Sequence, residues 1–122
     1  LNQGEVCFYL PDQDYGRSKA EFVPFFAVKD TASTTGTLLF ANAANCVVIP
    51  VITRRLPGSQ GYEIEVQPKL APFPTGDDKA DVTRVNQWVE QVVLRAPEQY
   101  MWLHRRFKTR PDPDAPSLYK GS

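Results

Sequence analysis

The chain is organised around residues 97–111, PEQYMWLHRRFKTRP, which place aromatic, apolar and basic side chains between two prolines. At helical spacing, Tyr100, Leu103 and Phe107 fall on one face of this segment. A proline suits the first turn of a helix, and a second proline pushes the residue before it out of helical geometry. The pattern therefore predicts a C-terminal helix bounded by these prolines.

The basic residues of this predicted helix, Arg105, Arg106, Lys108 and Arg110, admit two interpretations. In the first, they are solvated charges on the outer face of an amphipathic helix, as is usual. In the second, they form a cation cluster for a substrate phosphate or an acidic partner, because arginine presents the planar fork that phosphate prefers.

The composition indicates one globular domain, or a piece of one. A chain of 122 residues that is 42% hydrophobic is able to bury a core, which argues against global disorder. The formal net charge is zero, but basic residues dominate positions 84–110 and acidic residues gather at 12–14 and 77–81. A local basic end attracts anionic partners even in a neutral protein.

Cys7 and Cys46 are too few for a disulfide framework or a zinc site, and both lie in apolar runs. We therefore expect buried free thiols in a reducing compartment. The longest apolar run is far shorter than the roughly 20 residues that a membrane helix needs. Because the chain begins at Leu1 and its only methionine is Met101, we expect a longer parent protein whose front portion is missing.

Hydrophobic periodicity predicts an α/β fold, a partial mixed sheet with flanking helices. Strands are expected at 5–10, 46–52 and 62–67, an extended edge stretch at 22–28, and helices at 35–44 and 78–95. The run 46–52 is apolar throughout, so cover on both faces is expected, and 62–67 alternates as its antiparallel partner. The helix at 35–44 would be a right-handed crossover within one sheet.

Helix ends are marked by small polar residues. Thr34 or Thr35 is a candidate cap for the first helix, and Asn45 is a candidate stop because asparagine tolerates the left-handed conformation. Asp78 and Asp81 have the spacing of a capping pair for the second helix.

Two carboxylates, Asp12 and Asp14, directly follow the strand predicted at 5–10, and Arg17 is close behind. Loops at the carboxyl ends of strands are where sites collect in open α/β sheets. These carboxylates fit three roles: to bind a metal, to orient a base, or to cap the loop through hydrogen bonds to the backbone. The residues alone leave the choice open.

Other candidate groups are basic. Arg54 and Arg55 end an apolar strand and are either a solvated terminus or part of a binding site. His104 is the lone imidazole and therefore the only obvious base near neutral pH. The sequence contains no glycine-rich phosphate cradle, zinc spacing or nucleophile elbow.

Residues 97–111 closely resemble the C-terminal signature of the lipid A late acyltransferases, the lauroyl and myristoyl transferases of Gram-negative bacteria. The resemblance continues in register through PDQDYGR, FVPFFAV, TTGT and VITRR, at residues 11–17, 22–28, 34–37 and 51–55. It implies that residues 1–110 are the C-terminal part of one glycerolipid-acyltransferase-like domain and that residues 111–122 are a flexible tail.

The implied reaction transfers a fatty acyl chain from acyl carrier protein to a hydroxyl of a lipid A precursor, an acylated and phosphorylated glucosamine disaccharide. It would occur at the cytoplasmic face of the bacterial inner membrane, with a membrane anchor in the missing N-terminal portion. No metal or organic cofactor is implied.

The resemblance also implies roles for individual residues. Asp12 or Asp14 is expected at the catalytic site, where it orders the site or the substrate head group, and Arg17 is expected to contact phosphate. Arg54 and Arg55 would face the phosphorylated disaccharide.

The predicted C-terminal helix would supply Arg105 and Arg106, with the basic residues that follow, to lipid phosphates or to the acidic carrier protein. The catalytic motif of the family is a histidine followed, five positions later, by an acid that orients it. His104 is followed at that position by Thr109, so we interpret His104 as structural. The catalytic pair is therefore expected in the missing front portion.

A rival hypothesis is a non-catalytic module that binds an anionic partner, such as nucleic acid, through the basic C-terminal helix. Such binding weakens steeply with salt. The zero net charge and the absence of a basic stretch interleaved with aromatics disfavour nucleic acid as a partner.

Overall fold

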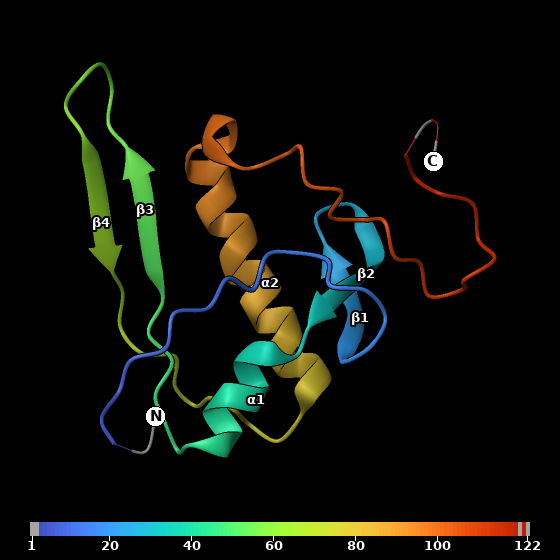
Figure 1. Cartoon of the computed structure of the whole chain (residues 1–122), viewed down its shortest axis with the longest axis horizontal. Coiled ribbons are helices and arrows are strands. Elements are labelled where there is room, and N and C mark those ends of the chain that lie inside the picture. The colour runs from blue at the N-terminus through green and yellow to red at the C-terminus, as the bar shows by residue number, and fades with distance from the viewer. Residues whose placement is uncertain (1–2, 120, 122) are drawn as a thin grey trace.

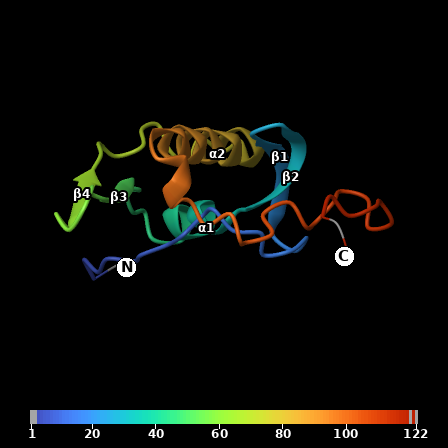
Figure 2. The same cartoon turned by 90° about the horizontal axis from the view of Figure 1, so that it is seen from above.

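The computed structural model describes residues 3–119 and 121. Its elements are β1 (Ala20–Phe25), β2 (Val28–Thr34), α1 (Gly36–Ala43), β3 (Val51–Arg55), β4 (Tyr62–Val66), α2 (Asp78–Arg95) and a 3₁₀ turn (Pro97–Gln99). Among the described residues, the strands form two separate antiparallel hairpins, β1–β2 and β3–β4. Helix α2 runs between the two hairpins (Figure 1). Helix α1 lies in a second layer beside α2 (Figure 2).

The β1–β2 hairpin is shaped by one proline and one strained turn residue. The strand register shifts between Val23 and Phe25, at Pro24, because proline has no N–H to give to the ladder. Phe26 turns the chain with a φ of 51°, which is unusual for an aromatic residue. Its backbone N–H donates to Glu90 Oε1 of α2 at 2.6 Å, so the helix fixes the turn.

Helix α2 builds the core through one apolar stripe, in which Val82, Val85, Val89 and Val93 are buried. Val82 packs against β1 and α1 in one cluster, and Val89 and Val93 pack against Phe25 in a second cluster. The 3.6-residue period of these valines is what makes this face apolar. The helix that the sequence predicted at these positions is confirmed.

The start of α2 differs in detail from the prediction. Asp77 is the cap, and its side chain accepts a hydrogen bond from Ala80 N at 3.0 Å. Asp81 is buried and instead accepts from the backbone N–H and the hydroxyl of Thr75, at 2.7 and 2.8 Å. The capping pair predicted for Asp78 and Asp81 was therefore wrong, because Asp81 turns back to the preceding loop.

Helix α1 starts and stops where its flanking residues predicted. Thr35 occupies the cap position without a side-chain hydrogen bond, while Thr34 Oγ1 accepts from Gly36 N at 3.0 Å. Asn45 takes a left-handed φ of 46° just after the helix. The antiparallel pairing of β4 with β3 is also confirmed.

The partial mixed sheet was wrong, and so was the crossover role of α1. Residues 5–10 and 46–50 form no strand, and Val6 and Phe8 are 97% and 80% exposed. A strand needs a continuous ladder for its backbone groups. Val48 O and Pro50 O accept from Leu70 N and Gln67 N at 2.9 Å, but these two bonds do not extend the β3–β4 ladder, and residues 6–10 form no backbone–backbone hydrogen bond with the described residues. The α/β class itself is confirmed.

The predicted burial of both cysteines was also wrong. Cys7 is exposed and Cys46 is partly buried, although both are free thiols as expected. Among the described residues, no helix combines the length and the apolarity that crossing a bilayer requires.

The helix predicted within residues 97–111 was wrong. A 3₁₀ turn ends at Gln99, and the chain then passes through turns and irregular backbone. The physical reason is tertiary: Tyr100 donates to Asp12 O at 3.3 Å and Arg106 donates to Ala32 O at 2.6 Å. Such long-range contacts override a weak local helix preference.

Candidate functional site

Asp14 joins two segments that are far apart in the sequence. Its side chain is 3% exposed, and its carboxylate accepts from Thr109 N at 2.8 Å and from Thr109 Oγ1 at 2.9 Å. The same carboxylate accepts from Gly16 N at 2.9 Å. Hydrogen bonds to a charged carboxylate are stronger than those between neutral groups. These contacts of Asp14 with Gly16 and Thr109, which we call the Asp14 clasp, therefore fix the loop at residues 12–19 against the C-terminal segment.

His104 supports the same clasp. Its Nε2 accepts a hydrogen bond from Asp14 N at 3.0 Å, so this nitrogen carries a lone pair rather than a proton in the structure. The contact joins the imidazole to a backbone amide and leaves this nitrogen occupied. His104 therefore positions the loop, in keeping with the structural interpretation.

Asp12 differs from Asp14 although the two are neighbours. Its carbonyl accepts from the Tyr100 hydroxyl at 3.3 Å, but within the described residues its half-buried carboxylate makes no hydrogen bond. Burial, together with the nearby charge of Asp12, raises the pKa of Tyr100 to about 12, so this hydroxyl stays a donor at neutral pH. Of the two aspartates, Asp12 is the one whose carboxylate is available to a ligand.

Arg106 lies in the core rather than on a basic surface. It is 2% exposed, and its guanidinium donates to Ala32 O at 2.6 Å and to Ser33 Oγ at 3.0 Å. It also lies 4.8 Å from the centre of the Phe25 ring, and burial lowers its pKa. In this arrangement Arg106 has no accessible surface for the anion-binding role that the sequence suggested.

A buried polar network around Ser33 was not identified from the sequence. Asn86 of α2 donates to Ser33 Oγ at 2.7 Å and to Pro24 O at 3.2 Å, and Ser33 donates to Thr31 O at 3.0 Å. With Arg106, this network links α2, the β1–β2 hairpin and the C-terminal segment. The sequence feature that could have indicated this network is Asn86, a polar residue within the apolar stripe of α2.

The remaining predicted arginines are at the surface. Arg17 donates to Pro111 O at 2.7 Å, and the Arg105 guanidinium lies 5.7 Å from the centre of the Tyr119 ring. Arg54 forms an exposed ion pair with Glu63 at 3.0 Å.

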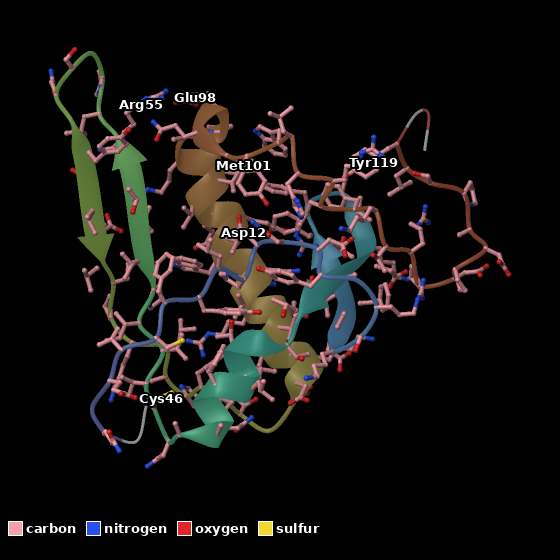
Figure 3. All side chains as sticks on the ribbon, viewed as in Figure 1. Asp12, Cys46, Arg55, Glu98, Met101 and Tyr119 are labelled. Atoms are coloured by element: carbon pink, nitrogen blue, oxygen red, sulfur yellow. The ribbon has the colours of Figure 1, made fainter. Side chains whose placement is uncertain are left out.

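Arg55 lies apart from Asp12, at the turn end of β3. In Figure 3 the labels of Arg55 and Glu98 stand together near one end of the β3–β4 hairpin, and that of Asp12 stands near the middle of the molecule. The backbone of Arg55 is bonded to the Gln99 side chain at 2.8 and 3.0 Å. The structure therefore separates the predicted site into an Asp12–Asp14–Arg17 group and an Arg54–Arg55 group.

The described residues contain no cluster of three or more histidine, cysteine or acidic side chains suited to a metal ion. They also contain no basic C-terminal helix, which is the element on which the anionic-module hypothesis rested. The groups that remain are the free carboxylate of Asp12, which accepts hydrogen bonds, and several arginines, which donate them, and together they suit the binding of a polar or anionic ligand.

Comparison with known proteins gives consistent matches over nearly the whole chain. A family model described as bacterial lipid A biosynthesis acyltransferase matches residues 1–109. The chain is 44% identical to the lipid A biosynthesis lauroyltransferase of Escherichia coli (strain K12) over 119 residues, which cover 98% of the chain and 39% of that protein.

Two further relatives give the same picture. The chain is 40% identical to the lipid A biosynthesis palmitoleoyltransferase of Escherichia coli (strain K12), over 98% of the chain and 38% of that protein. It is 45% identical to a lipid A biosynthesis acyltransferase of Haemophilus influenzae, over 98% of the chain and 39% of that protein. The chain thus spans about two fifths of the length of these relatives.

Proposed function

This chain belongs to the bacterial lipid A biosynthesis acyltransferase family, and we propose that it is part of an enzyme that transfers a fatty acyl chain to a lipid A precursor. The observation that carries the proposal is similarity over 98% of the chain to proteins named for lauroyl and palmitoleoyl transfer. We propose acyl carrier protein as the donor and a sugar hydroxyl of the precursor as the acceptor.

We further propose that the chain is the C-terminal part of a glycerolipid-acyltransferase-like domain, with residues 1–110 in the domain and residues 111–122 as a tail. Two observations support the view that this chain is part of a larger domain. The relatives are about two and a half times as long, and Tyr62, Ile64 and Val66 on the β3–β4 hairpin are 71%, 67% and 67% exposed. Apolar surface of this extent is normally covered by another part of the protein.

The catalytic base is proposed to lie in that other part. The chain has one histidine, His104, and its imidazole is bonded to the backbone of Asp14. A histidine that deprotonates a hydroxyl needs an acid to orient it, and His104 has no such partner in the described residues. The same missing part is proposed to carry the membrane anchor at the cytoplasmic face of the inner membrane.

Within this chain we propose that Asp12 orders the acceptor head group, because its carboxylate is the available one. Asp14 acts indirectly by holding the loop that carries Asp12 and Arg17. Arg54, Arg55 and Arg105 are proposed to contact phosphate or the acidic carrier protein from the surface. Arg106 instead contributes by holding the C-terminal segment to the β1–β2 hairpin.

The test compares the full-length parent with the 122-residue chain in an assay of acyl transfer from acyl carrier protein to a lipid A precursor. We expect transfer by the parent and none by the chain. In the parent, Asp12→Asn is expected to lower the rate at least tenfold. Transfer by the 122-residue chain would overturn the placement of the base, and an inactive parent would overturn the function.

A further inference from the structure

The Asp14 clasp places cations from two distant segments side by side. Its carboxylate holds Gly16 N on one side and Thr109 on the other, at 2.8–2.9 Å. Arg17 directly follows Gly16, and the residues on either side of Thr109 are Lys108 and Arg110. All three cations line one hollow at the surface, which we call the basic hollow.

The basic hollow carries an excess of positive charge. Its ionisable lining consists of Arg17, Lys108 and Arg110 against a single carboxylate, Asp112. That carboxylate is already engaged, since Asp112 Oδ1 accepts from Asp114 N at 2.9 Å. None of the three cations forms an ion pair with any described residue.

The arginines of the hollow are oriented but not neutralised. Arg17 Nη1 donates to Pro111 O at 2.7 Å and Arg110 Nη1 donates to Pro116 O at 3.2 Å, and both acceptors are uncharged carbonyls. These contacts occupy one terminal nitrogen of each guanidinium and leave the other terminal nitrogen, Nη2, without a hydrogen bond to the described residues. Arg110 Nε is buried and has no hydrogen-bond partner among the described residues.

We propose that the basic hollow is a subsite for a phosphate monoester, and that in the enzyme it binds a phosphate of the acceptor sugar. The second part rests on the proposed function. A phosphate monoester carries about −1.5 to −2 charges at pH 7, which matches the net lining charge of three cations and one carboxylate. Arginine forks bind phosphate oxygens in pairs, and Lys108 adds a compact charge.

The experiment titrates the natural polypeptide that carries this chain with N-acetylglucosamine 1-phosphate, inorganic phosphate and unphosphorylated N-acetylglucosamine, by calorimetry at low salt. We expect the sugar phosphate to bind more tightly than inorganic phosphate, and the unphosphorylated sugar not to bind. Arg17→Gln and Lys108→Gln are each expected to weaken sugar phosphate binding about tenfold, and Asp112→Asn to strengthen it severalfold.

Arg84→Gln is the matched control. Arg84 Nη1 donates to Pro72 O at 2.7 Å, the same contact that Arg17 makes with Pro111, but Arg84 lies outside the hollow. We expect this variant to bind sugar phosphate like the unaltered protein. Equal weakening by Arg84→Gln and Lys108→Gln would overturn the subsite, because it would indicate general charge attraction. Lys108 is exposed, so its replacement tests the hollow without loss of packing.

Acyl transfer separates this proposal from the proposed function. In an active parent, Lys108→Gln is expected to raise KM for the acceptor about tenfold with kcat little changed. If the parent is active but these substitutions change neither its KM for the acceptor nor its affinity for sugar phosphate, the subsite proposal is overturned and the proposed function is not. If the parent shows no acyl transfer but its variants show the expected pattern of sugar phosphate binding, only the proposed function is overturned. Variants that weaken binding of the acidic carrier protein, but not of sugar phosphate, would also overturn the subsite.

Discussion

The two hairpins that flank α2 differ in how completely they are packed. In β1–β2, Val23 and Phe25 are each 1% exposed, and the polar Ser33 is fully hydrogen-bonded in the core. In β3–β4, Ile64 and Val66 are each 67% exposed although both are apolar. The comparison indicates that the β1–β2 side is complete by itself, whereas the β3–β4 side has the composition of a surface that another segment covers.

The largest effect is expected at the centre of the packed side. Phe25→Ala leaves a cavity beside Val89 and Val93, and we expect it to lower the free energy of unfolding by about 3–5 kcal/mol. Tyr62→Ala on the exposed hairpin is the control, with an expected change within about 0.5 kcal/mol. Urea denaturation of the chain measures both. Similar losses for the two variants would refute the contrast between the hairpins.

Removal of the clasp is expected to have the next largest effect. Asp14→Ala deprives Gly16 N, Thr109 N and the Thr109 hydroxyl of their acceptor, and we expect a loss of about 2–4 kcal/mol by urea denaturation. Glu63→Ala is the matched carboxylate on the other hairpin, where its exposed ion pair with Arg54 contributes about 0–1 kcal/mol. If both substitutions lower the free energy of unfolding by the same amount, the contacts of Asp14 do not stabilise the fold as described.

The alkaline pH dependence of stability is a third, smaller test of the packed side. The pKa of Tyr100 is about 12 in the folded chain against an ordinary 10.0, so the unfolded chain loses this proton first. The stabilisation is present below pH 10 and is lost as the pH rises from about 10 to 12.

Denaturation midpoints at a series of alkaline pH values check this expectation. Tyr100→Phe has no titrating hydroxyl, and its stability should fall less steeply over the same range. Identical slopes for the two proteins would show that Tyr100 is not buried in the way described.

The smallest effect on stability is expected on the exposed β3–β4 hairpin. In the 122-residue chain, Ile64→Ser is expected to change the free energy of unfolding by less than about 0.5 kcal/mol, because the side chain is 67% exposed. In the proposed full-length parent we expect a larger loss of about 1–2 kcal/mol, since the proposed cover would bury the same side chain. Equal effects in both proteins would argue against a covered hairpin.

The elements that the sequence predicted well are those in which apolar residues repeat along a local period. Helix α2 shows this with buried valines at helical spacing. Strand β4 shows it with alternating apolar and polar residues, although its apolar side chains are exposed in this chain. Residues 5–10 and 46–50 were mispredicted because an apolar run becomes a strand only when a continuous ladder of backbone hydrogen bonds forms beside it. That condition depends on the whole fold, so a local pattern is not sufficient to determine it.

The candidate site was predictable in part for the same reason. Asp12, Asp14 and Arg17 stand out locally, as a polar loop after an apolar run. The partner of Asp14 is Thr109, which lies 95 positions away, and no local pattern links the two. Arg106 was expected to be exposed because arginine usually is, yet the carbonyl of Ala32 and the hydroxyl of Ser33 draw it inside.

The inward-facing Arg106 has a consequence for where this polypeptide tolerates shortening. A stop codon placed before residue 106 would delete the buried guanidinium that donates to Ala32 O and Ser33 Oγ, as well as the Thr109 end of the Asp14 contact. A stop codon placed after Pro111 would spare all of these, and would remove the contact of Arg110 with Pro116, the Tyr119 hydroxyl that accepts from Phe107 N, and the part of the basic hollow that residues 112–117 line. Nonsense mutations a few codons apart should therefore separate a degraded product from a persistent one.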